Sequence, residues 1–563
     1  MLGGTPKKEV FDTAIVSHVK GRFVLTGLTR REQGAAEACG AEAASGGRWL
    51  LPSPFCPEGL ARLVEALPGL TVDGSAAGAM EQEVQKRRFF AEYSNTATAP
   101  TVALRREDAR LDPHQGVGAS FLLSAGRALL CDDPGLGKTA QAICAADAAP
   151  LPSGTTKLVI APKSLLLQWQ TEIGRFSAHP ECAVLGMKDV LPGGVPWLVT
   201  NYEVAVRRQE ELAASSPGVL IVDEAARIKN RKAARTRGIW RIAKSSAYCF
   251  LLTATPIRNY PEELWSLLHC LEPNRYRGFW QFANTFIEQS DNGFGIDLGG
   301  VRADRLEELH GELIPRLLQR SKALLNLPPL TFEEVVLQPE AKAAKAYRQM
   351  EKTFVALLES GEVLLAPNTL ARLTRLRQIT ADPALCEAPG GSAKTQWLLD
   401  WLEDNAATRK VVVFSPFKTY IRRLAQATAQ YGPVVITGDE TLAEREAAKR
   451  RLNTDPTCRL LLGTDSAAGE GLNLQEQADV VVFTGKSWTP DLVEQCVGRV
   501  YRRGQSRPVH VYSLVCADTV DRDIEEVLAD KAASAREALS IQAVAERLRK
   551  RVNTVAEEVA VVG

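Results

Sequence analysis

A glycine-rich segment in the first third of the chain combines the residue types that bind phosphate. It reads Asp132-Asp-Pro-Gly-Leu-Gly-Lys-Thr139 and lies between an apolar run typical of a strand and an alanine-rich run typical of a helix. Gly135 and Gly137 would let the backbone approach phosphate oxygens, and the N-terminus of the following helix favours an anion. Lys138 would neutralise the β- and γ-phosphates, and Thr139 would bind Mg²⁺. Asp132 replaces the first glycine of the Walker A pattern, so a turn that binds nothing is the alternative.

Two adjacent acids later in the chain supply what nucleotide hydrolysis needs. Asp223 and Glu224 end the apolar run Leu220-Ile-Val. One carboxylate would hold the Mg²⁺ shell, and the other would orient or deprotonate the attacking water. Such a pair alone is more often a helix cap or a solvated turn, but about 85 residues after a phosphate loop it indicates a Walker B pair. The predicted catalytic residues are Lys138, Asp223 and Glu224, the predicted metal ligands are Thr139 and Asp223, and ATP is predicted to contact Asp133, Pro134, Gly135, Leu136, Gly137, Lys138 and Thr139.

The elements around these residues alternate between buried strands and helices. Continuous apolar runs of this kind are typical of parallel sheets that helices cover on both faces. The first group of predicted strands begins at residues 128, 157, 197, 219 and 249, and the second at 410, 433, 460, 480 and 509. Two similar sheets in one chain predict an α/β fold in which two lobes flank a cleft.

Changes in pattern divide the chain into five regions. Residues 1–98 mix short strands with an amphipathic helix, which predicts a small α+β accessory domain, and a polar linker follows. Residues 101–325 are predicted to form the first lobe, 326–400 a helical connector and 401–530 the second lobe. Residues 531–563 are expected to form a helical tail.

The composition excludes several classes of protein. The chain has 563 residues, with 68 Lys and Arg against 67 Asp and Glu and 45% hydrophobic residues, so neither wholesale disorder nor a uniformly basic protein is expected. Its 11 cysteines include no C-x-x-C pair, which argues against a disulfide framework or a zinc ribbon. We expect no signal peptide, because the first residues lack its apolar stretch, and no run approaches the roughly 18 apolar residues needed to cross a bilayer. We expect a cytoplasmic monomer without a membrane partner, and the compact alanine-rich chain suits a bacterial or phage-infected cell.

Further motifs accompany the phosphate loop and the acid pair. In chain order they are Leu111-Asp-Pro-His-Gln, Ala161-Pro-Lys-Ser, Thr200-Asn-Tyr-Glu, Leu252-Thr-Ala-Thr-Pro, Val413-Phe-Ser-Pro-Phe, Thr464-Asp-Ser-Ala-Ala-Gly-Glu-Gly and Gln495-Cys-Val-Gly-Arg-Val-Tyr-Arg-Arg. Over residues 105–530, this series resembles the motifs of superfamily-two helicases and translocases, most closely the Swi/Snf-type branch. The resemblance implies two RecA-like parallel-sheet lobes, hydrolysis of ATP with Mg²⁺, and movement along double-stranded DNA.

The resemblance assigns further residues to the nucleotide. Gln115 would recognise adenine, and Gly469 and Gly471 would line the ATP cleft. Arg499 and Arg502 are three positions apart, on one face if this segment is helical. Two guanidinium groups aimed across a cleft can stabilise charge on the γ-phosphoryl group. Because they fall in the second lobe, hydrolysis would require the lobes to close, and cyclic closure would move each lobe along DNA.

Nucleic-acid contacts are predicted from a basic run and from the resemblance. Residues 227–244 carry eight Lys and Arg and no acid, which indicates either a solvated face or a surface that contacts phosphates. Such contacts do not depend on base sequence. The predicted DNA-binding residues are Lys163, Ser164, Asn201, Tyr202, Lys229, Ser415, Thr464 and Trp488, and the alternative for Trp488 is packing beneath its own loop.

The leading hypothesis is an ATP-dependent translocase on duplex or forked DNA. The alternatives are a strand-separating DNA or RNA helicase and a nucleotide-gated DNA-binding scaffold with weak ATPase. Ala226 departs from the family pattern, which has histidine there, and the missing imidazole would have helped to couple hydrolysis to nucleic-acid binding. Residues 1–98 resemble the HARP-type module that precedes the motor of annealing helicases, and an accessory domain without DNA contact is the alternative.

Overall fold

The computed structural model describes residues 14–529 apart from short internal segments. These segments are 21, 53, 95–98, 103–105, 107–108, 255, 257–260, 292–295, 354, 358–362, 366–368, 469–473, 488–489 and 527. The tail predicted for residues 531–563 therefore lies outside the described residues.

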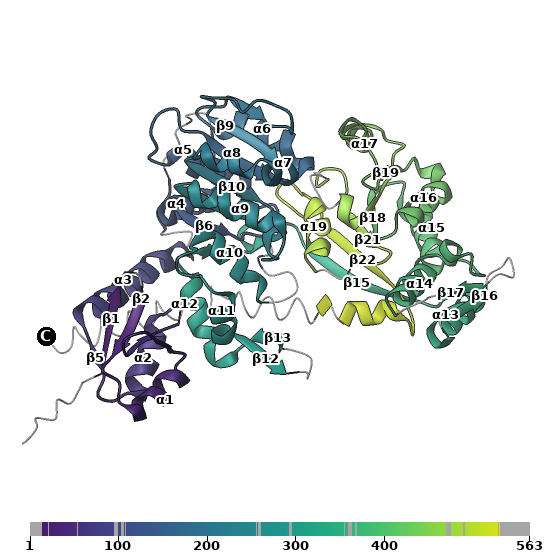
Figure 1. The fold of residues 1–563 in the computed structure, drawn as a ribbon. Helices are drawn as coiled ribbons and strands as arrows, with labels where there is room; N and C mark the ends of the chain where they lie inside the picture. Colours follow the sequence, from purple (N-terminus) through teal and green to yellow (C-terminus); the bar gives the residue numbers. More distant parts are fainter. Residues whose placement is uncertain are drawn as a thin grey trace, which may run out of the picture.

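The N-terminal domain is a five-stranded sheet with three helices, at the lower left of Figure 1. Side chains from strands and helices, among them Val16, Leu25 and Leu63, form its buried core. Its strands pair in the order β3-β4-β2-β1-β5 and are β1 (Ile15–Val19), β2 (Arg22–Thr26), β3 (Glu42–Ala44), β4 (Arg48–Leu50) and β5 (Thr71–Val72). Its helices are α1 (Arg30–Ala38), α2 (Pro57–Ala66) and α3 (Gly74–Ala91). Thr29 and Glu32 form a capping box that begins α1.

Lobe 1 is built on a seven-stranded parallel sheet in the order β14-β6-β11-β10-β7-β9-β8. Its central strands are buried along nearly their whole length because helices pack on the sheet and leave little of it facing water. The strands are β6 (Arg127–Leu130), β7 (Lys157–Ala161), β8 (Cys182–Val184), β9 (Trp197–Asn201), β10 (Val219–Asp223), β11 (Tyr248–Leu252) and β14 (Leu317–Leu318). The helices are α4 (Pro113–Ala125), α5 (Lys138–Ala148), α6 (Leu166–Phe176), α7 (Tyr202–Arg207), α8 (Gln209–Ala214) and α9 (Ala234–Ser245).

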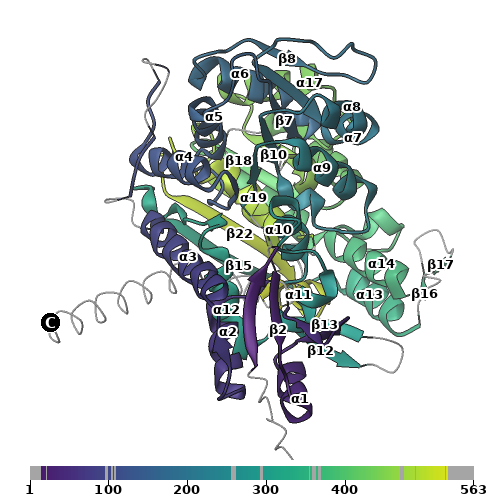
Figure 2. The same ribbon diagram turned by 60° about the vertical axis from the view of Figure 1, so that its left-hand side comes forward.

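A mostly helical segment lies between β11 and β14 in the chain, and it lies beside the N-terminal domain in space (Figures 1 and 2). It comprises α10 (Glu263–Leu271), α11 (Phe279–Phe286), the antiparallel strands β12 (Ile287–Asp291) and β13 (Ile296–Val301), and α12 (Leu306–Leu313). Figure 2 shows α3 running from the N-terminal sheet alongside this segment toward α4.

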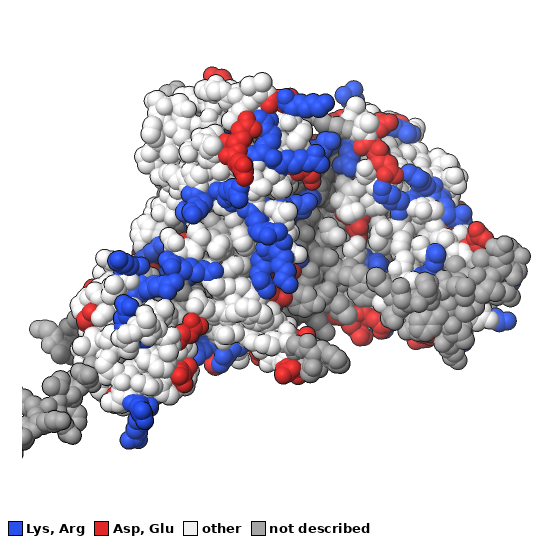
Figure 3. Space-filling view, viewed as in Figure 1, with Lys and Arg blue, Asp and Glu red and all other residues white. Residues whose placement is uncertain are grey.

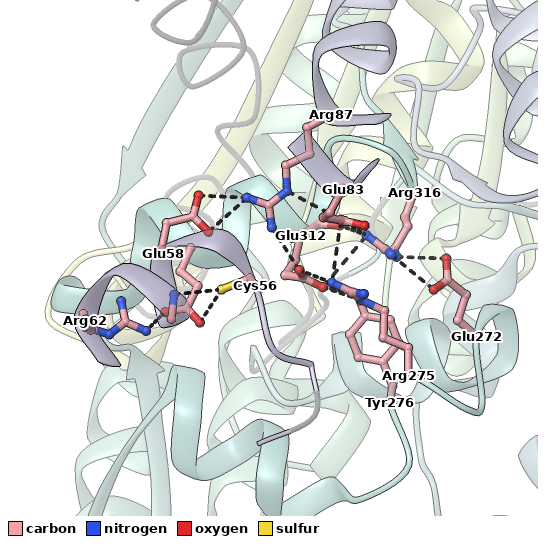
Figure 4. A network of polar contacts seen from close by, with 12 residues as sticks. Cys56, Glu58, Arg62, Glu83, Arg87, Glu272, Arg275, Tyr276, Glu312 and Arg316 are labelled. Carbon is pink, nitrogen blue, oxygen red and sulfur yellow. Dashed lines mark hydrogen bonds and ion pairs between the residues drawn. The ribbon is translucent and has the colours of Figure 1, made fainter. Parts of the chain in front are cut away.

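A buried network of charged side chains joins the N-terminal domain to α12 (Figure 4). At its centre, the fully buried carboxylate of Glu312 accepts hydrogen bonds from Arg87 on α3 at 3.0 Å and from the Tyr276 hydroxyl at 3.0 Å. Arg275 donates two more, at 2.5 and 2.9 Å. Arg87 also donates to Glu58 on α2 at 2.8 Å. Burial alone would raise the pKa of Glu312, but the surrounding arginines hold it below its usual value, so the carboxylate stays charged inside the joint.

Lobe 2 is built on a six-stranded parallel sheet in the order β15-β22-β21-β18-β20-β19. Its strands are β15 (Leu330–Leu337), β18 (Val411–Ser415), β19 (Val434–Ile436), β20 (Leu460–Thr464), β21 (Val480–Phe483) and β22 (Val509–Cys516), and a separate antiparallel pair is β16 (Val355–Leu357) and β17 (Val363–Leu365). Its helices are α13 (Ala341–Thr353), α14 (Thr369–Ala381), α15 (Ala393–Asn405), α16 (Lys418–Ala427), α17 (Leu442–Thr454), α18 (Asp465–Ala468) and α19 (Pro490–Val500).

The predicted fold class, two parallel-sheet lobes with a small α+β domain, is confirmed. The helical connector predicted for residues 326–400 is only partly right, because β15 pairs with β22 along its full length. That strand has no continuous apolar run, since charged residues such as Glu333 and Glu334 interrupt it and remain exposed at the sheet edge. In the part of the chain that the structure describes, no helix is long and apolar enough to cross a bilayer.

Candidate nucleotide and nucleic-acid site

The predicted phosphate loop connects β6 to α5, and side chains of α4 hydrogen-bond to its backbone. Gly135 and Gly137 have φ values of +98° and +79°, a backbone region that favours glycine. A Cβ on Gly137 would lie 2.2 Å from Nε2 of Gln115, so a side chain there would displace the Gln115 amide. His114 Nε2 and Gln115 Nε2 lie 3.1 and 3.3 Å from the carbonyl oxygen of Leu136. The loop is thus a backbone cradle of the shape that a phosphate chain needs.

Asp132 has a structural partner that explains why it replaces glycine. Its carboxylate is fully buried and accepts hydrogen bonds from Arg320 Nε at 2.9 Å and Arg320 Nη2 at 2.5 Å. Gln141 on α5 donates to the same carboxylate at 3.0 Å. Arg320 follows β14, so the bidentate pair fixes the edge of the sheet to the loop. Arg320 is not among the predicted site residues; its segment, Leu317-Leu-Gln-Arg-Ser-Lys, resembles the Swi/Snf-type branch, but its spacing does not reveal the partner of Arg320.

The predicted phosphate-binding lysine is bonded to the loop in this structure. Lys138 Nζ donates to the carbonyl oxygen of Asp132 at 2.6 Å. Thr139 follows it on the first turn of α5. Gln115 is the residue predicted to recognise adenine. Its side-chain oxygen accepts a hydrogen bond from the N–H of Asp112 at 3.0 Å, and its side-chain nitrogen faces the loop. Gln115 is therefore brought to the loop, where it supports the backbone directly.

The predicted acid pair ends β10. Asp223 Oδ2 accepts a hydrogen bond from Trp169 Nε1 at 2.9 Å, and Oδ1 accepts from the N–H of Glu224 at 2.9 Å. Burial, with Glu224 beside it, raises the pKa of Asp223 to about 6, although the Trp169 hydrogen bond and Lys138 act against the rise. Glu224 itself has φ +52°, a left-handed conformation that is strained for a residue with a side chain.

Tyr202 holds this strained turn in place. Its hydroxyl donates to the carbonyl oxygen of Asp223 at 2.5 Å and lies 3.2 Å from that of Glu224. The side chain is only 1% exposed, and burial raises its pKa well above the usual value. The structure therefore does not support the predicted DNA contact of Tyr202. It assigns this residue, together with Trp169, to positioning the acid pair.

The donor set at the end of β10 fits a divalent cation. Asp223 and Glu224 place two half-buried carboxylates next to each other in the chain, and burial together with the Glu224 charge raises the pKa of Asp223. Mg²⁺ prefers oxygen ligands of this kind, with one or two carboxylates and the phosphates of a substrate. Asp223 and the Thr139 hydroxyl are the protein groups that would hold it.

The predicted arginines of lobe 2 lie at the end of α19, on the side of lobe 2 that faces lobe 1 in Figure 1. A Cβ on Gly135 would lie 3.0 Å from Cβ of Arg502, and a Cβ on Gly498 would lie 2.9 Å from Cβ of Pro134. Burial, with Arg499 nearby, lowers the pKa of Arg502 to about 10, while Glu172 of lobe 1 opposes the change. The end of α19 therefore packs directly on the phosphate loop.

A further ion pair joins the lobes at the rim of this contact. Arg503 Nη1 lies 2.8 Å from Oδ2 of Asp112, the residue that precedes α4. Arg503 is 60% exposed, so the pair is screened by water and adds little to the closed arrangement.

The predicted DNA-binding residues of lobe 1 are placed differently from one another. Lys163 is exposed and Ser164 half-buried in the turn after β7. The side chain of Asn201 caps α7 by accepting a hydrogen bond from the N–H of Val204 at 3.0 Å. Lys229 Nζ lies 2.6 Å from Oε1 of Glu263, so its charge is compensated within lobe 1. Lys163 is thus the most accessible of the four.

Two predicted DNA-binding residues of lobe 2 are buried. Ser415, at the end of β18, has no exposed surface, and Thr464, at the end of β20, is 2% exposed. The Thr464 hydroxyl lies 3.4 Å from the carbonyl oxygen of Thr437. Neither side chain can reach a nucleic-acid strand in this structure, because both face inward where their strands end. The predicted residues Gly469, Gly471 and Trp488 lie outside the described residues.

The basic run of residues 227–244 lies on the surface of lobe 1. Figure 3 shows Lys and Arg gathered over the region of α7 to α9 and again over α3. Arg231 lies over the ring of Phe279, 3.8 Å from its centre, and Arg235 lies 5.6 Å from the centre of the Tyr202 ring. The exposed members of the run are Lys232, Arg237, Arg241 and Lys244.

Comparison with known proteins agrees with this arrangement of motifs. Residues 114–385 match the SNF2-related domain, and residues 393–504 match the helicase conserved C-terminal domain. The first match contains the phosphate loop and the acid pair, and the second contains Arg499 and Arg502.

Several characterised proteins resemble the chain over most of its length. It is 27% identical over 524 residues to the Zorya protein ZorD of Escherichia coli, which covers 80% of this chain and 47% of ZorD. It is 28% identical over 452 residues to the SWI/SNF-related matrix-associated actin-dependent regulator of chromatin subfamily A-like protein 1 of Xenopus tropicalis, covering 77% of this chain and 46% of the relative. It is 27% identical over 438 residues to the DNA annealing helicase and endonuclease ZRANB3 of Bos taurus, covering 73% and 39%.

The chain spans less than half the length of each of these relatives. Both domain matches and all three relatives nevertheless point to one group of proteins. The chain belongs to the SNF2 family, the Swi/Snf-type branch of the superfamily-two helicases and translocases.

Proposed function

We propose that this protein is an ATP-dependent translocase that acts on duplex or forked DNA and hydrolyses ATP between its two lobes. The observation that carries the proposal is the contact between Arg502 of lobe 2 and Gly135 of the phosphate loop in lobe 1. A guanidinium group placed there can stabilise the charge that develops on a γ-phosphoryl group. Hydrolysis would then depend on closure of the lobes, and each cycle of closing and opening would displace the DNA held across them.

Each group in the cleft has a chemical role in this proposal. Lys138 leaves the Asp132 carbonyl and neutralises the β- and γ-phosphates. Glu224 orients the attacking water or accepts its proton, in a position fixed by the Tyr202 hydrogen bonds. Thr139 and Asp223 would hold Mg²⁺, which would supply further compensation of phosphate charge. The residues proposed to contact ATP are those of the phosphate loop from Asp133 to Thr139, Gln115 and, on lobe 2, Arg499, Arg502, Gly469 and Gly471.

The DNA would lie across the basic surface of lobe 1. Lys163 and the exposed residues of the run, such as Lys232 and Lys244, present positive charge at the surface. Side chains of this kind contact phosphates and do not distinguish one base sequence from another. Binding of this kind releases counterions, so it should weaken steeply as salt rises. No preferred base sequence is expected.

The N-terminal domain would extend this surface. Its α3 carries the exposed Arg88 and the half-buried Lys86, and the Glu312 network fixes this helix to lobe 1, so DNA held by both would move with both. This arrangement suits fork remodelling or strand annealing, an activity that the name of the ZRANB3 relative includes. We further propose that the protein works as a monomer in a bacterial cytoplasm, where its eleven free thiols would stay reduced.

The test is ATPase turnover with no nucleic acid and then with single-stranded DNA, duplex DNA, forked DNA or RNA. We expect strong stimulation by duplex or forked DNA, and none of the turnover should survive in Lys138→Ala. Stimulation by single strands or RNA alone would contradict the duplex translocase and favour a strand-separating helicase. Weak turnover that no nucleic acid changes would favour a nucleotide-gated scaffold.

A charge-reversal variant tests the DNA surface separately. Lys232→Glu with Lys244→Glu should lower duplex stimulation and leave basal turnover unchanged, because both side chains are exposed and neither is among the residues proposed to contact ATP. The matched control reverses two exposed lysines on α13 of lobe 2, Lys342→Glu with Lys345→Glu, and should behave as the wild type. Equal loss of stimulation in both double variants would place the DNA elsewhere.

A further inference from the structure

Lys322 is attached to the phosphate loop by its backbone. It begins a short turn directly after Arg320 and Ser321, at the end of β14. Its N–H donates to Oδ2 of Asp133 at 2.9 Å, and the N–H of Asp133 donates in turn to the carbonyl oxygen of Arg320 at 3.0 Å. With the Asp132 pair behind it, the start of this side chain is therefore fixed relative to the loop.

The side chain of Lys322 extends from lobe 1 to lobe 2. Its ammonium lies 3.5 Å from the point that a Cβ on Gly498 would occupy, and 5.5 Å from the centre of the Tyr501 ring. Pro134 of the loop faces the same glycine. Because Gly498 has no side chain, the loop and the ammonium of lobe 1 both reach the end of α19. Lys322 thus stands where the two lobes meet over the loop.

The charge on Lys322 is incompletely compensated by the protein. Among the described residues, no carboxylate lies within 4.0 Å of its ammonium, and none of them accepts a hydrogen bond from it. Asp133 and Glu494 attract it only from longer range, while Lys138 and Arg502 repel it. Burial and these two cations lower the pKa of Lys322 to about 8. A half-buried ammonium in this state would gain from a bound anion.

Three positive groups converge on one end of the loop. Lys138 follows the loop, Arg502 packs on Gly135, and Lys322 reaches Gly498 beside Pro134. A triphosphate placed at this end of the loop carries enough negative charge to attract all three. Lys322 lies near Arg502, which is proposed to act on the γ-phosphoryl group, so the terminal phosphate is its expected ligand. That phosphate is the part of ATP that both lobes can reach and that leaves on hydrolysis.

We propose that Lys322 binds the terminal phosphate of ATP and thereby ties lobe 1 to lobe 2 when the triphosphate is present. The inference rests on the proposal that this cleft binds ATP. Lys322 would act as a sensor: its ammonium holds the closed arrangement while the γ-phosphate is present and releases it when that phosphate leaves. An entirely structural lysine, which would only fix the turn after β14, is the competing explanation.

Binding of two nucleotides separates these explanations. Affinity for the non-hydrolysable triphosphate AMP-PNP and for ADP would be measured by calorimetry, with Mg²⁺, for the wild type, Lys322→Met, Lys322→Arg and the surface control Lys342→Met. We expect Lys322→Met to weaken AMP-PNP binding roughly tenfold to a hundredfold, as loss of a charged hydrogen bond should. ADP binding should change less than about twofold, and Lys322→Arg should keep most of the affinity for AMP-PNP, because it keeps the charge.

Other outcomes would overturn the inference. Equal weakening of AMP-PNP and ADP in Lys322→Met, or unchanged binding of both, would show that Lys322 does not sense the terminal phosphate. A thermal melt identifies a misfolded Lys322→Met, and in that case Lys322→Arg decides through its pH profile. A wild type that binds neither nucleotide would instead refute the ATP cleft itself, together with every role assigned in it.

The pH profile is a readout that a structural role would not move. Above pH 8 the free ammonium of Lys322 loses its proton, so AMP-PNP affinity of the wild type should fall as pH rises through that value. An arginine stays charged, and the fall should be absent in Lys322→Arg. The titratable and charged groups that face Lys322 are Asp133, Glu494, Lys138 and Arg502. They are present in both the wild type and Lys322→Arg, so a difference between the two pH profiles reports on residue 322. The same alkaline fall in both proteins would overturn the proposal.

Discussion

The two junctions of lobe 1 are built in opposite ways. Toward the N-terminal domain, the buried Glu312 is surrounded by arginines from both sides and by a tyrosine hydroxyl, so each charge has its partner within the chain. Toward lobe 2, the contact brings together glycines, a proline and several cations over the phosphate loop. The first junction pairs its charges within the chain, whereas the second gathers cations where we propose that a polyphosphate binds.

The difference indicates which parts move. A buried network of ion pairs is costly to separate, so the N-terminal domain and lobe 1 should move as one body. At the second junction, Asp133 and Glu494 attract the buried Lys322 while Lys138 and Arg502 repel it, and a bound polyphosphate would add attraction for all three cations. We therefore expect the cleft between the lobes to be the hinge of the molecule, with nucleotide setting its state.

Removing a cation from the second junction should have the largest effect. Arg502→Ala should lower kcat for ATP hydrolysis about a thousandfold, since an arginine that stabilises a transferring phosphoryl group contributes on that scale. ATP binding should change far less, because Lys138 and the loop backbone remain. Steady-state turnover together with nucleotide titration measures both quantities.

The neighbouring arginine provides the control for this change. Arg503→Ala removes only the exposed pair with Asp112, so kcat should stay within a few-fold of the wild type. A kcat within threefold of the wild type in Arg502→Ala would break the comparison, because the second junction would then have no role in hydrolysis.

Breaking the first junction should change stability instead of chemistry. Glu312→Gln leaves Arg87 and Arg275 buried without a charged partner at the centre, and the free energy of unfolding should fall by about 3 kcal/mol. Turnover of the folded protein without DNA should remain, because the network lies outside the cleft. Chemical denaturation followed by tryptophan fluorescence, with ATPase assays on the folded protein, tests both statements.

A carboxylate on the same helix serves as the matched control. Glu307 is exposed on α12, and Glu307→Gln should leave the unfolding curve nearly unchanged. If both variants unfolded alike, the buried network would not be the element that fixes the N-terminal domain. If Glu312→Gln abolished turnover while remaining folded, the two junctions would be coupled and the comparison would have to be revised.

The sequence was most informative where function constrains the backbone. Gly135 and Gly137 need positive φ values, and Asp223 must end a buried strand, so the motif itself predicts the local geometry. The apolar runs predicted the fold class, because strands that helices cover on both faces are apolar along nearly their whole length. An edge strand such as β15 gives no such signal, because Glu333 and Glu334 interrupt its apolar residues and most of its side chains are exposed.

Side-chain direction could not be predicted in the same way. Tyr202, Ser415 and Thr464 stand at strand ends, where one residue can face either the cleft or the interior, and the structure places all three inside. The partners that position the site, Arg320 and Trp169, come from distant segments and have no spacing to reveal them. Lys322 became a candidate only when both lobes were seen around it.

The smallest effect is expected for a change at Ala226. This residue lies between the acid pair and the basic run in the chain, outside the charged groups of both junctions. It is 1% exposed in the turn after β10, where the family pattern has histidine. Ala226→His should change the ratio of DNA-stimulated to basal ATPase by a few-fold more than it changes basal turnover, because an imidazole there would link the acid pair to the DNA side of lobe 1. The added volume alone should cost about 1–3 kcal/mol of stability, so Ala226→Leu controls for bulk. A ratio that stays the same in Ala226→His, or that shifts equally in Ala226→Leu, would mean that the closed cleft signals to the DNA surface by another route.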